Sequence, residues 1–252
     1  MNRRPRTATA AVLLTTGLLL TAACGTKTPA PPASSPSTIS AAAGHAGRSA
    51  PEPQLPREIP SLGAKTRDRI PATARQVVVV TGESADSNRS SVTLYVRDAK
   101  GGWSPDSGPW QAHNALRGWS EDHHAGDLHS PTGVFTLTDA GGRRANPGTR
   151  LPYDRGPAFV AHGTGFHGES LAGSFDYVVA INYNRKPGTT PLDWTRPMGA
   201  SRGGGVWFHV EHGGPTHGCV ALAEPRMKEL LRWLDPSKKP VVVMGDAGSL
   251  AR

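Results

Sequence analysis

Short runs of β-branched and apolar residues, separated by Gly, Pro, Asn and Asp, follow one another along the chain from residue 76 onward. Val77–Thr81 is continuously β-branched, which predicts a buried strand, and residues 91–97 alternate apolar with polar side chains, which predicts a half-buried one. Lys100-Gly101-Gly102 predicts a turn that leads into Trp103 and closes a hairpin. This succession restricts the chain to a mainly β fold. We expect further strands over residues 134–138, 158–162, 177–183, 206–210, 220–222 and 240–244.

One short helix is predicted near the C-terminus. Pro225 suits a first helical position, and apolar residues recur at helical spacing from Met227 to Leu234 before Asp235-Pro236 ends the run. Residues 76–248 are long enough for one well-cored domain, which we expect to be a β-sandwich or barrel. The tryptophans at 103, 110, 119, 207 and 233 favour core or rim packing over a sugar-binding platform.

The N-terminal segment is typical of an export signal. Three arginines, the last being Arg6, precede an apolar stretch over residues 8–23 that ends in small residues. Ala22-Ala23-Cys24 resembles a bacterial lipobox, so we expect a signal peptide over residues 1–23 and a lipid on the Cys24 thiol. The protein would then be exported and lipid-anchored on the outer face of the bacterial cell membrane. Ordinary secretory cleavage, which would leave Cys24 free or removed, is the alternative.

Residues 24–75 are predicted to be a disordered tether. They are rich in Pro, Ala, Ser and Gly, with eight prolines between Pro29 and Pro60. The formal net charge of the chain is +8, but residues 76–252 carry 18 Lys and Arg against 17 Asp and Glu. The basic excess therefore lies in the signal and tether. It argues weakly for attraction to anionic membrane or wall polymers and against a nucleic-acid-binding domain.

Cys219 is the only cysteine beyond Cys24, so no disulfide framework supports the fold. It follows Thr216-His217-Gly218 and comes ten residues after His209. A thiolate is a nucleophile, and a nearby imidazole can take the thiol proton or hold its charge. A small buried apolar residue is the alternative role for a free cysteine. The polar neighbours of Cys219 favour catalysis.

The spacing around Cys219 suggests a role for each neighbour. The turn over residues 211–215 is so short that 206–210 and 216–222 should be adjacent strands, with His209 across from Cys219. We assign His209 as the proton acceptor and donor, with His212 in reserve, and expect an imidazolium there to lower the thiol pKa. His217 shares a face with Cys219 and would orient the site. Gly218 keeps the backbone open, so that the amide of Cys219 can stabilise an oxyanion.

These residues resemble the L,D-transpeptidases (YkuD-type catalytic domain) of bacterial cell walls, whose pattern is a histidine, a loop and Ser/Thr-His-Gly-Cys. Upstream, residues 130–135, Ser-Pro-Thr-Gly-Val-Phe, are similar to another segment of that family, and the resemblance covers roughly residues 76–246. The chain departs from the pattern in two ways. Its loop from His209 to His217 is shorter than in better-known members, and Ala221 stands where asparagine is frequent.

The resemblance implies an L,D-transpeptidase-type fold and a specific reaction on peptidoglycan. Cys219 would attack the third residue of a tetrapeptide stem, release the terminal D-alanine and form a thioester. An amine on a neighbouring stem would then resolve the thioester as a 3→3 cross-link, whereas water would make the enzyme an L,D-carboxypeptidase. We expect no cofactor, no metal and a monomeric chain. Thr216 is a candidate substrate contact, and so is Arg202, which is otherwise a solvated loop arginine.

Two other function classes stay open. A zinc-dependent wall hydrolase would draw on His209, His212, His217 and Cys219, with a second histidine patch at residues 123, 124 and 129. Against it, an extended strand would point His209 and His212 to opposite faces, and residues 121–127 are typical of a solvated loop. A catalytically inactive wall-binding module would also suit a tethered β domain. We expect His162 and His167 to be structural or loop residues.

Overall fold

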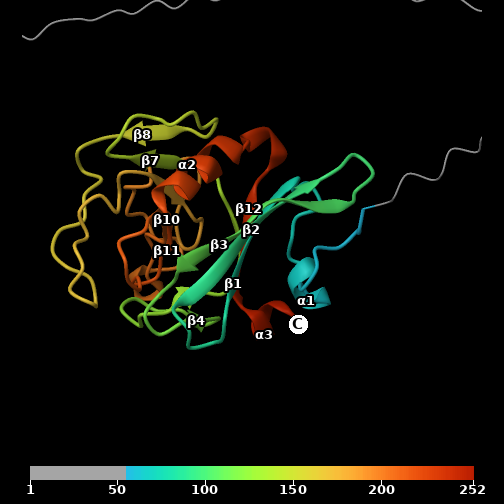
Figure 1. Ribbon diagram of the computed structural model, residues 1–252, viewed down its shortest axis with the longest axis horizontal. Coiled ribbons are helices and arrows are strands. Elements are labelled where there is room, and N and C mark those ends of the chain that lie inside the picture. The colour runs from blue at the N-terminus through green and yellow to red at the C-terminus, as the bar shows by residue number, and fades with distance from the viewer. Residues whose placement is uncertain (1–54) are drawn as a thin grey trace, which may run out of the picture. The chain divides into compact units, whose positions relative to one another are not determined.

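Ten strands form one mixed sheet, which is the framework of the domain (Figure 1). The computed structural model describes residues 55–252, so the predicted signal peptide, Cys24 and the predicted tether up to residue 54 lie outside the described residues. The strand order is β6 (Gly133–Thr136), β12 (Val241–Asp246), β1 (Gln76–Gly82), β2 (Arg89–Arg97), β3 (Trp103–His113), β11 (Val220–Leu222), β10 (Trp207–Val210), β9 (Val178–Ala180), β7 (Ala140–Gly142) and β8 (Tyr153–Arg155). A separate pair joins β4 (Trp119–Ser120) to β5 (Ser130–Pro131).

The sheet has two buried faces because its central strands are apolar on both sides. In β1, Val78 and Val80 face the main core, whereas Val77 and Val79 face a second apolar cluster. The main core is closed by the amphipathic helix α2 (Glu224–Trp233), which buries Met227, Leu230 and Leu231. The predicted mainly β fold with one short helix near the C-terminus is therefore confirmed. Two 3-10 turns, η1 (Ala200–Arg202) and η2 (Pro236–Lys238), and the four-residue helix α3 (Ala247–Leu250) complete this part of the chain.

The packed structure begins earlier than the sequence predicted. Residues 55–75 were expected to belong to the tether, but Ile59, Leu62 and Ala74 are buried in the second cluster beside Leu250 of α3. The short helix α1 (Ala64–Arg67) lies next to α3, and the Gly63 N–H donates to the Leu250 carbonyl at 2.8 Å (Figure 1). Three well-spaced apolar residues are enough to hold this segment, although its average composition is that of a linker.

Most predicted strands and the hairpin from β2 to β3 are present, and one predicted strand is wrong. Residues 158–162 form a loop, because Phe159 is inserted as a single buried side chain next to Trp207, with ring centroids 6.1 Å apart. The tryptophans at 103, 110, 119 and 207 are buried, as predicted. Among residues 55–252, no helix combines the length and the apolar character that a membrane span requires.

Candidate active site

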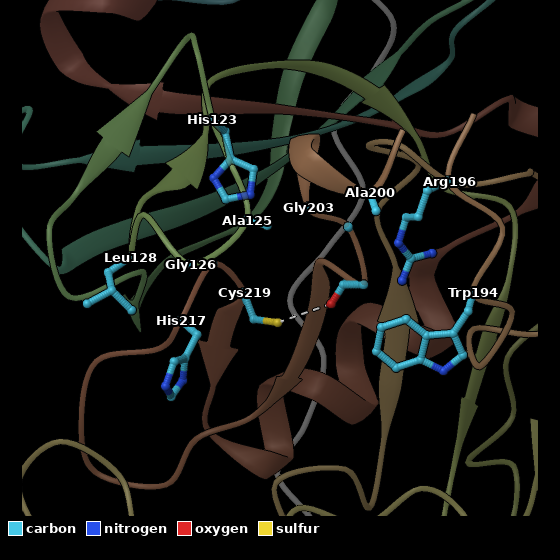
Figure 2. A pocket seen from close by; sticks show the side chains of 13 residues that line it. His123, Ala125, Gly126, Leu128, Trp194, Arg196, Ala200, Gly203, His217 and Cys219 are labelled. Atoms are coloured by element: carbon cyan, nitrogen blue, oxygen red, sulfur yellow. Dashed lines mark hydrogen bonds between the residues drawn. The ribbon is translucent and has the colours of Figure 1, made fainter. Parts of the chain in front are cut away.

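Cys219 lies at the edge of a cavity of about 480 Å³, immediately before β11 (Figure 2). Three segments line this pocket: residues 123–128, 194–205 and 217–219. Parallel pairing of β10 with β11 puts Phe208 opposite Val220, which places Cys219 next to Trp207. The Trp207 N–H points to Sγ at 3.4 Å, and the thiol donates to the Gly205 carbonyl at 3.7 Å.

The resting thiol is protonated. Although Cys219 borders the pocket, burial of its sulfur raises the pKa to about 11, and the contact from the Trp207 N–H lowers it only partly. The sequence analysis expected an imidazolium to lower this pKa. That expectation is wrong for the resting site, because none of the described residues places an imidazole within hydrogen-bonding distance of Sγ.

His209 lies on the thiol's side of the sheet but is displaced along the strand. It pairs with Ala221, two residues beyond Cys219, so the predicted position directly across from the thiol is wrong. The residue is 3% exposed, and Nδ1 of its ring lies 2.8 Å from the Val210 carbonyl. Nδ1 must carry the proton to make that bond, which leaves the lone pair on Nε2. Burial lowers the pKa of His209 to about 4, so the ring is neutral at neutral pH.

His212 packs on His209. The two rings are stacked with centroids 5.6 Å apart, so the expectation that they point to opposite faces is wrong. The reason is that β10 ends at Val210, and the following turn brings His212 back over the strand. Its Nδ1 lies 3.1 Å from Glu169 Oε1, which holds this ring at the back of His209.

The turn before Cys219 is shaped by Thr216. Its buried hydroxyl donates to the Cys219 carbonyl at 2.7 Å and accepts from the Gly218 N–H at 3.2 Å. Thr216 therefore supports the turn, and the structure does not place its hydroxyl as a substrate contact. The Gly218 N–H is also engaged, which leaves the N–H of Cys219 as the candidate oxyanion donor, since the described loop hydrogen bonds include none from it. His217 is exposed at the pocket and contacts Phe166, with ring centroids 4.6 Å apart.

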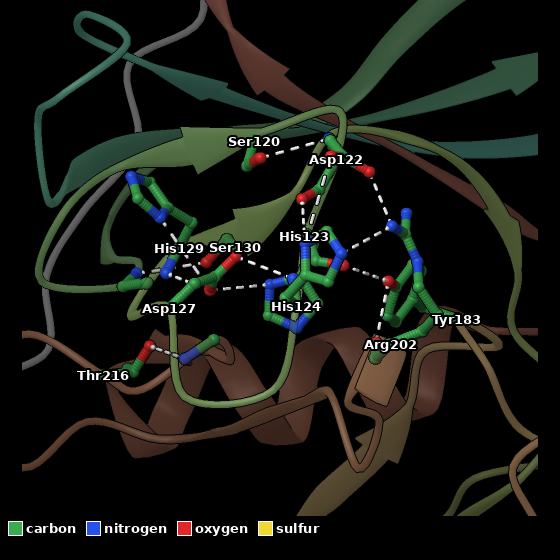
Figure 3. Close-up of polar contacts among 12 residues, drawn as sticks. Ser120, Asp122, His123, His124, Asp127, His129, Ser130, Tyr183, Arg202 and Thr216 are labelled. Atoms are coloured by element: carbon green, nitrogen blue, oxygen red, sulfur yellow. Dashed lines mark hydrogen bonds and ion pairs between the residues drawn. The ribbon is translucent and has the colours of Figure 1, made fainter. Parts of the chain in front are cut away.

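Arg202 does not reach the pocket. Its Nη1 lies 2.5 Å from Asp122 Oδ1 and 3.1 Å from His124 Nε2, so the predicted contact with a substrate carboxylate is not supported (Figure 3). Arg196 lines the pocket instead, with its guanidinium 4.8 Å from the ring centre of Trp194 (Figure 2). Sequence reasoning missed both residues. The sequence signal that could have indicated them is Trp194 itself, which stands two positions before Arg196.

The segment that carries Trp194 and Arg196 is anchored at its start by a buried ion pair. Arg185 Nη1 lies 2.8 Å from Asp139 Oδ2, and the two side chains are 2% and 4% exposed. The same carboxylate oxygen accepts from the Gly188 N–H at 2.9 Å. Asn184 ties the far end of the segment, donating to the Gly203 carbonyl at 2.6 Å. One wall of the pocket therefore has defined attachment points at both ends.

Residues 121–127 are mostly exposed, as predicted for a solvated loop, but His123 is an exception. His123 is buried and lines the pocket, and its Nδ1 lies 3.0 Å from Asp127 Oδ1. Within residues 55–252, no three His, Cys, Asp or Glu side chains converge as a group able to hold a metal ion. The zinc alternative needed such a convergence.

A model of the L,D-transpeptidase catalytic domain family, YkuD, matches residues 85–243. The matched region includes His123, Arg196, His209, His217 and Cys219. No curated protein and no solved structure shows a significant match to the chain.

Proposed function

Because the chain belongs to the L,D-transpeptidase family, whose catalytic domains act on peptidoglycan peptides, we propose that it is a cysteine-dependent L,D-transpeptidase that forms 3→3 cross-links between tetrapeptide stems. The observation that carries the proposal is the position of Cys219, whose thiol lies at the pocket with a neutral histidine on the same side of the sheet.

In the acylation step, the thiol must lose its proton as it attacks. His209 is the general base, because its neutral ring has a free lone pair on Nε2 and shares the thiol's face of the sheet. To pass its proton to that nitrogen, the thiol must give up its hydrogen bond to the Gly205 carbonyl. The C–S bond forms, and the N–H of Cys219 stabilises the oxyanion. The C–N bond to D-alanine then breaks, and the proton on His209 passes to the leaving amine.

The lining of the pocket suits an anionic peptide. Stem peptides carry free carboxylates, and Arg196 is a cation on the pocket wall. Its Nη1 donates to two carbonyls of its own segment at 3.1 Å each, which holds the guanidinium over Trp194. A guanidinium fixed in this way can bind a carboxylate through its remaining N–H groups. We assign Arg196 the role of binding the carboxylate of the donor stem.

Muropeptide analysis tests the reaction. The protein is incubated with purified wall rich in tetrapeptide stems, and the digested products are identified by mass spectrometry, with Cys219→Ala as the control. We expect 3→3 dimers and free D-alanine from the wild type alone. Tripeptide stems without dimers would indicate an L,D-carboxypeptidase. No change in the wall would favour the inactive binding module, and equal products from Cys219→Ala would place the nucleophile elsewhere.

We further propose that the enzyme is exported and anchored by a lipid on Cys24. A lipid anchor followed by a Pro-rich tether would let the domain act on wall peptides at some distance from the membrane. This part of the proposal rests on the sequence alone, since Cys24 lies outside the described residues.

A further inference from the structure

A second histidine borders the pocket on a segment that the reaction outlined above does not use. His123 belongs to the loop between β4 and β5 and lines the same cavity as Cys219 (Figure 2). Its ring is buried, packs edge-on against Tyr183 with centroids 5.2 Å apart, and has Nδ1 facing the Asp127 carboxylate at 3.0 Å (Figure 3). The carboxylate lies off the N–H direction, so the contact is electrostatic rather than a well-aligned hydrogen bond.

Asp127 is built to stay ionised and in place. One carboxylate oxygen accepts from the His124 N–H at 2.7 Å and the other from the His129 N–H at 2.9 Å. Burial acts to raise the pKa of Asp127, but these hydrogen bonds and the neighbouring histidines lower it below its ordinary value. A fixed carboxylate at Nδ1 favours the tautomer with its proton on that nitrogen, which leaves Nε2 as a base.

The Nε2 side of the ring faces the pocket wall. A Cβ added to Gly203 would lie 2.8 Å from Nε2, and one added to Gly218 would lie 3.9 Å from the adjacent Cε1. The ring therefore sits between the loop that carries Arg196 and the residue before the nucleophile. Nε2 has no hydrogen-bond partner among the described residues, whereas both oxygens of the neighbouring Asp127 carboxylate accept backbone N–H groups.

We propose that His123, oriented by Asp127, is a second acid–base residue of this active site and takes the proton of the acceptor amine when the thioester is resolved. The inference rests on the proposed transpeptidation. The amine nitrogen forms a bond to the thioester carbonyl carbon, and its proton moves to His123 Nε2. The C–S bond then breaks, and the released thiolate of Cys219 recovers a proton from the imidazolium, directly or through water. His123 ends the cycle neutral and the thiol protonated.

The positions of the two histidines support this division. His209 is buried and is not part of the pocket lining. His123 borders the open cavity through which an acceptor must enter. Burial lowers its pKa, Asp127 acts to raise it, and the charges of Arg202 and His129 act to lower it, with the Tyr183 ring packed alongside. A neutral imidazole is the form that accepts a proton.

The test separates the two half-reactions. The wild type, His123→Gln and Asp127→Asn are mixed with a tetrapeptide donor, and acylation is followed by D-alanine release and by the mass of the thioester. The preformed thioester is then resolved with a diamino-acid amine at several pH values. The matched control is His124→Gln, which removes the neighbouring histidine, whose side chain contacts Arg202.

We expect His123→Gln to acylate within about threefold of the wild type but to resolve the thioester about 100-fold more slowly, the usual scale for loss of a general base. Asp127→Asn should move the rise of the resolution rate with pH to lower pH, because loss of the neighbouring anion lowers the pKa of the His123 imidazole. His124→Gln should resemble the wild type. Equal losses in both half-reactions, or resolution unaffected by either variant, would overturn the role of His123. No thioester in the wild type would instead overturn the proposed function and, with it, this inference.

Discussion

The burial of His209 makes the stability of the fold depend on pH in a calculable way. Burial is the main reason that its pKa falls from 6.5 to about 4, because the hydrogen bond to the Val210 carbonyl only partly opposes it. In the unfolded chain the ring titrates near its ordinary value. Between these values the unfolded state binds a proton that the folded state excludes, so stability falls as the pH drops from above 6.5 to about 4. At about 1.4 kcal/mol per pH unit, His209 alone should remove about 3 kcal/mol.

His209→Gln isolates this contribution, because glutamine is of similar size and does not titrate. Urea unfolding at pH 7.5 and at pH 4 gives, for each protein, the change in its unfolding free energy between the two pH values. Subtracting the change of the variant from that of the wild type removes the contribution of the other titrating groups. We expect the wild type to lose about 3 kcal/mol more than the variant. Equal losses would refute the argument that His209 is held neutral by burial. The general-base role would then have to be replaced by a preformed thiolate–imidazolium pair.

Four further outcomes follow from the structure and the sequence. Iodoacetamide should alkylate Cys219 at pH 7 about 300-fold more slowly than it alkylates a thiol of pKa about 8.5. The alkylation rate, followed by intact mass, should keep rising past pH 10, and a rate that reaches a plateau near pH 8 would contradict the raised pKa. Arg196→Met should raise KM for the donor peptide about tenfold and leave alkylation unchanged. In denaturant unfolding, Asp139→Ala should cost about 3–5 kcal/mol by leaving Arg185 uncompensated, and Arg185→Met in the same chain should recover most of it. Cys24→Ser should move the protein from the detergent phase to the aqueous phase, and a wild type already in the aqueous phase would exclude the lipid anchor.

The adjacency of β10 and β11 could be predicted from the sequence, but the relative direction of the two strands could not. The apolar runs at 206–210 and 220–222 and the short connection between them indicate neighbouring buried strands. Parallel strands usually need a crossover of about a dozen residues or more. Here β10 and β11 are so short that the connection over residues 211–219 can bring the chain back from the end of β10 to the start of a parallel β11. The parallel register is what moves His209 away from the position opposite Cys219.

The pocket walls could not be predicted, because they depend on contacts between residues distant in sequence. His123 has charged and glycine neighbours, which locally indicate a solvated loop. It is buried because Tyr183 and the Gly203 segment pack on it, about 60 and 80 positions away. The sequence made Arg202 a candidate for a substrate carboxylate because it lies in a glycine-rich run, although a solvated loop arginine was the favoured reading. Only the folded chain reveals that Asp122 binds it and that Arg196 faces the cavity.

A protonated resting thiol also bears on how the cysteine of the proposed exported enzyme avoids chemical damage. Oxidation and alkylation proceed through the thiolate, so a thiol with a pKa of about 11 is almost inert at neutral pH. The same burial that protects Cys219 also keeps His209 neutral, which preserves the base needed when a substrate carbonyl arrives. Reactivity then depends on proton transfer during attack rather than on a standing thiolate. In the proposed reaction this makes the thiol selective for carbonyls that the pocket can hold against it.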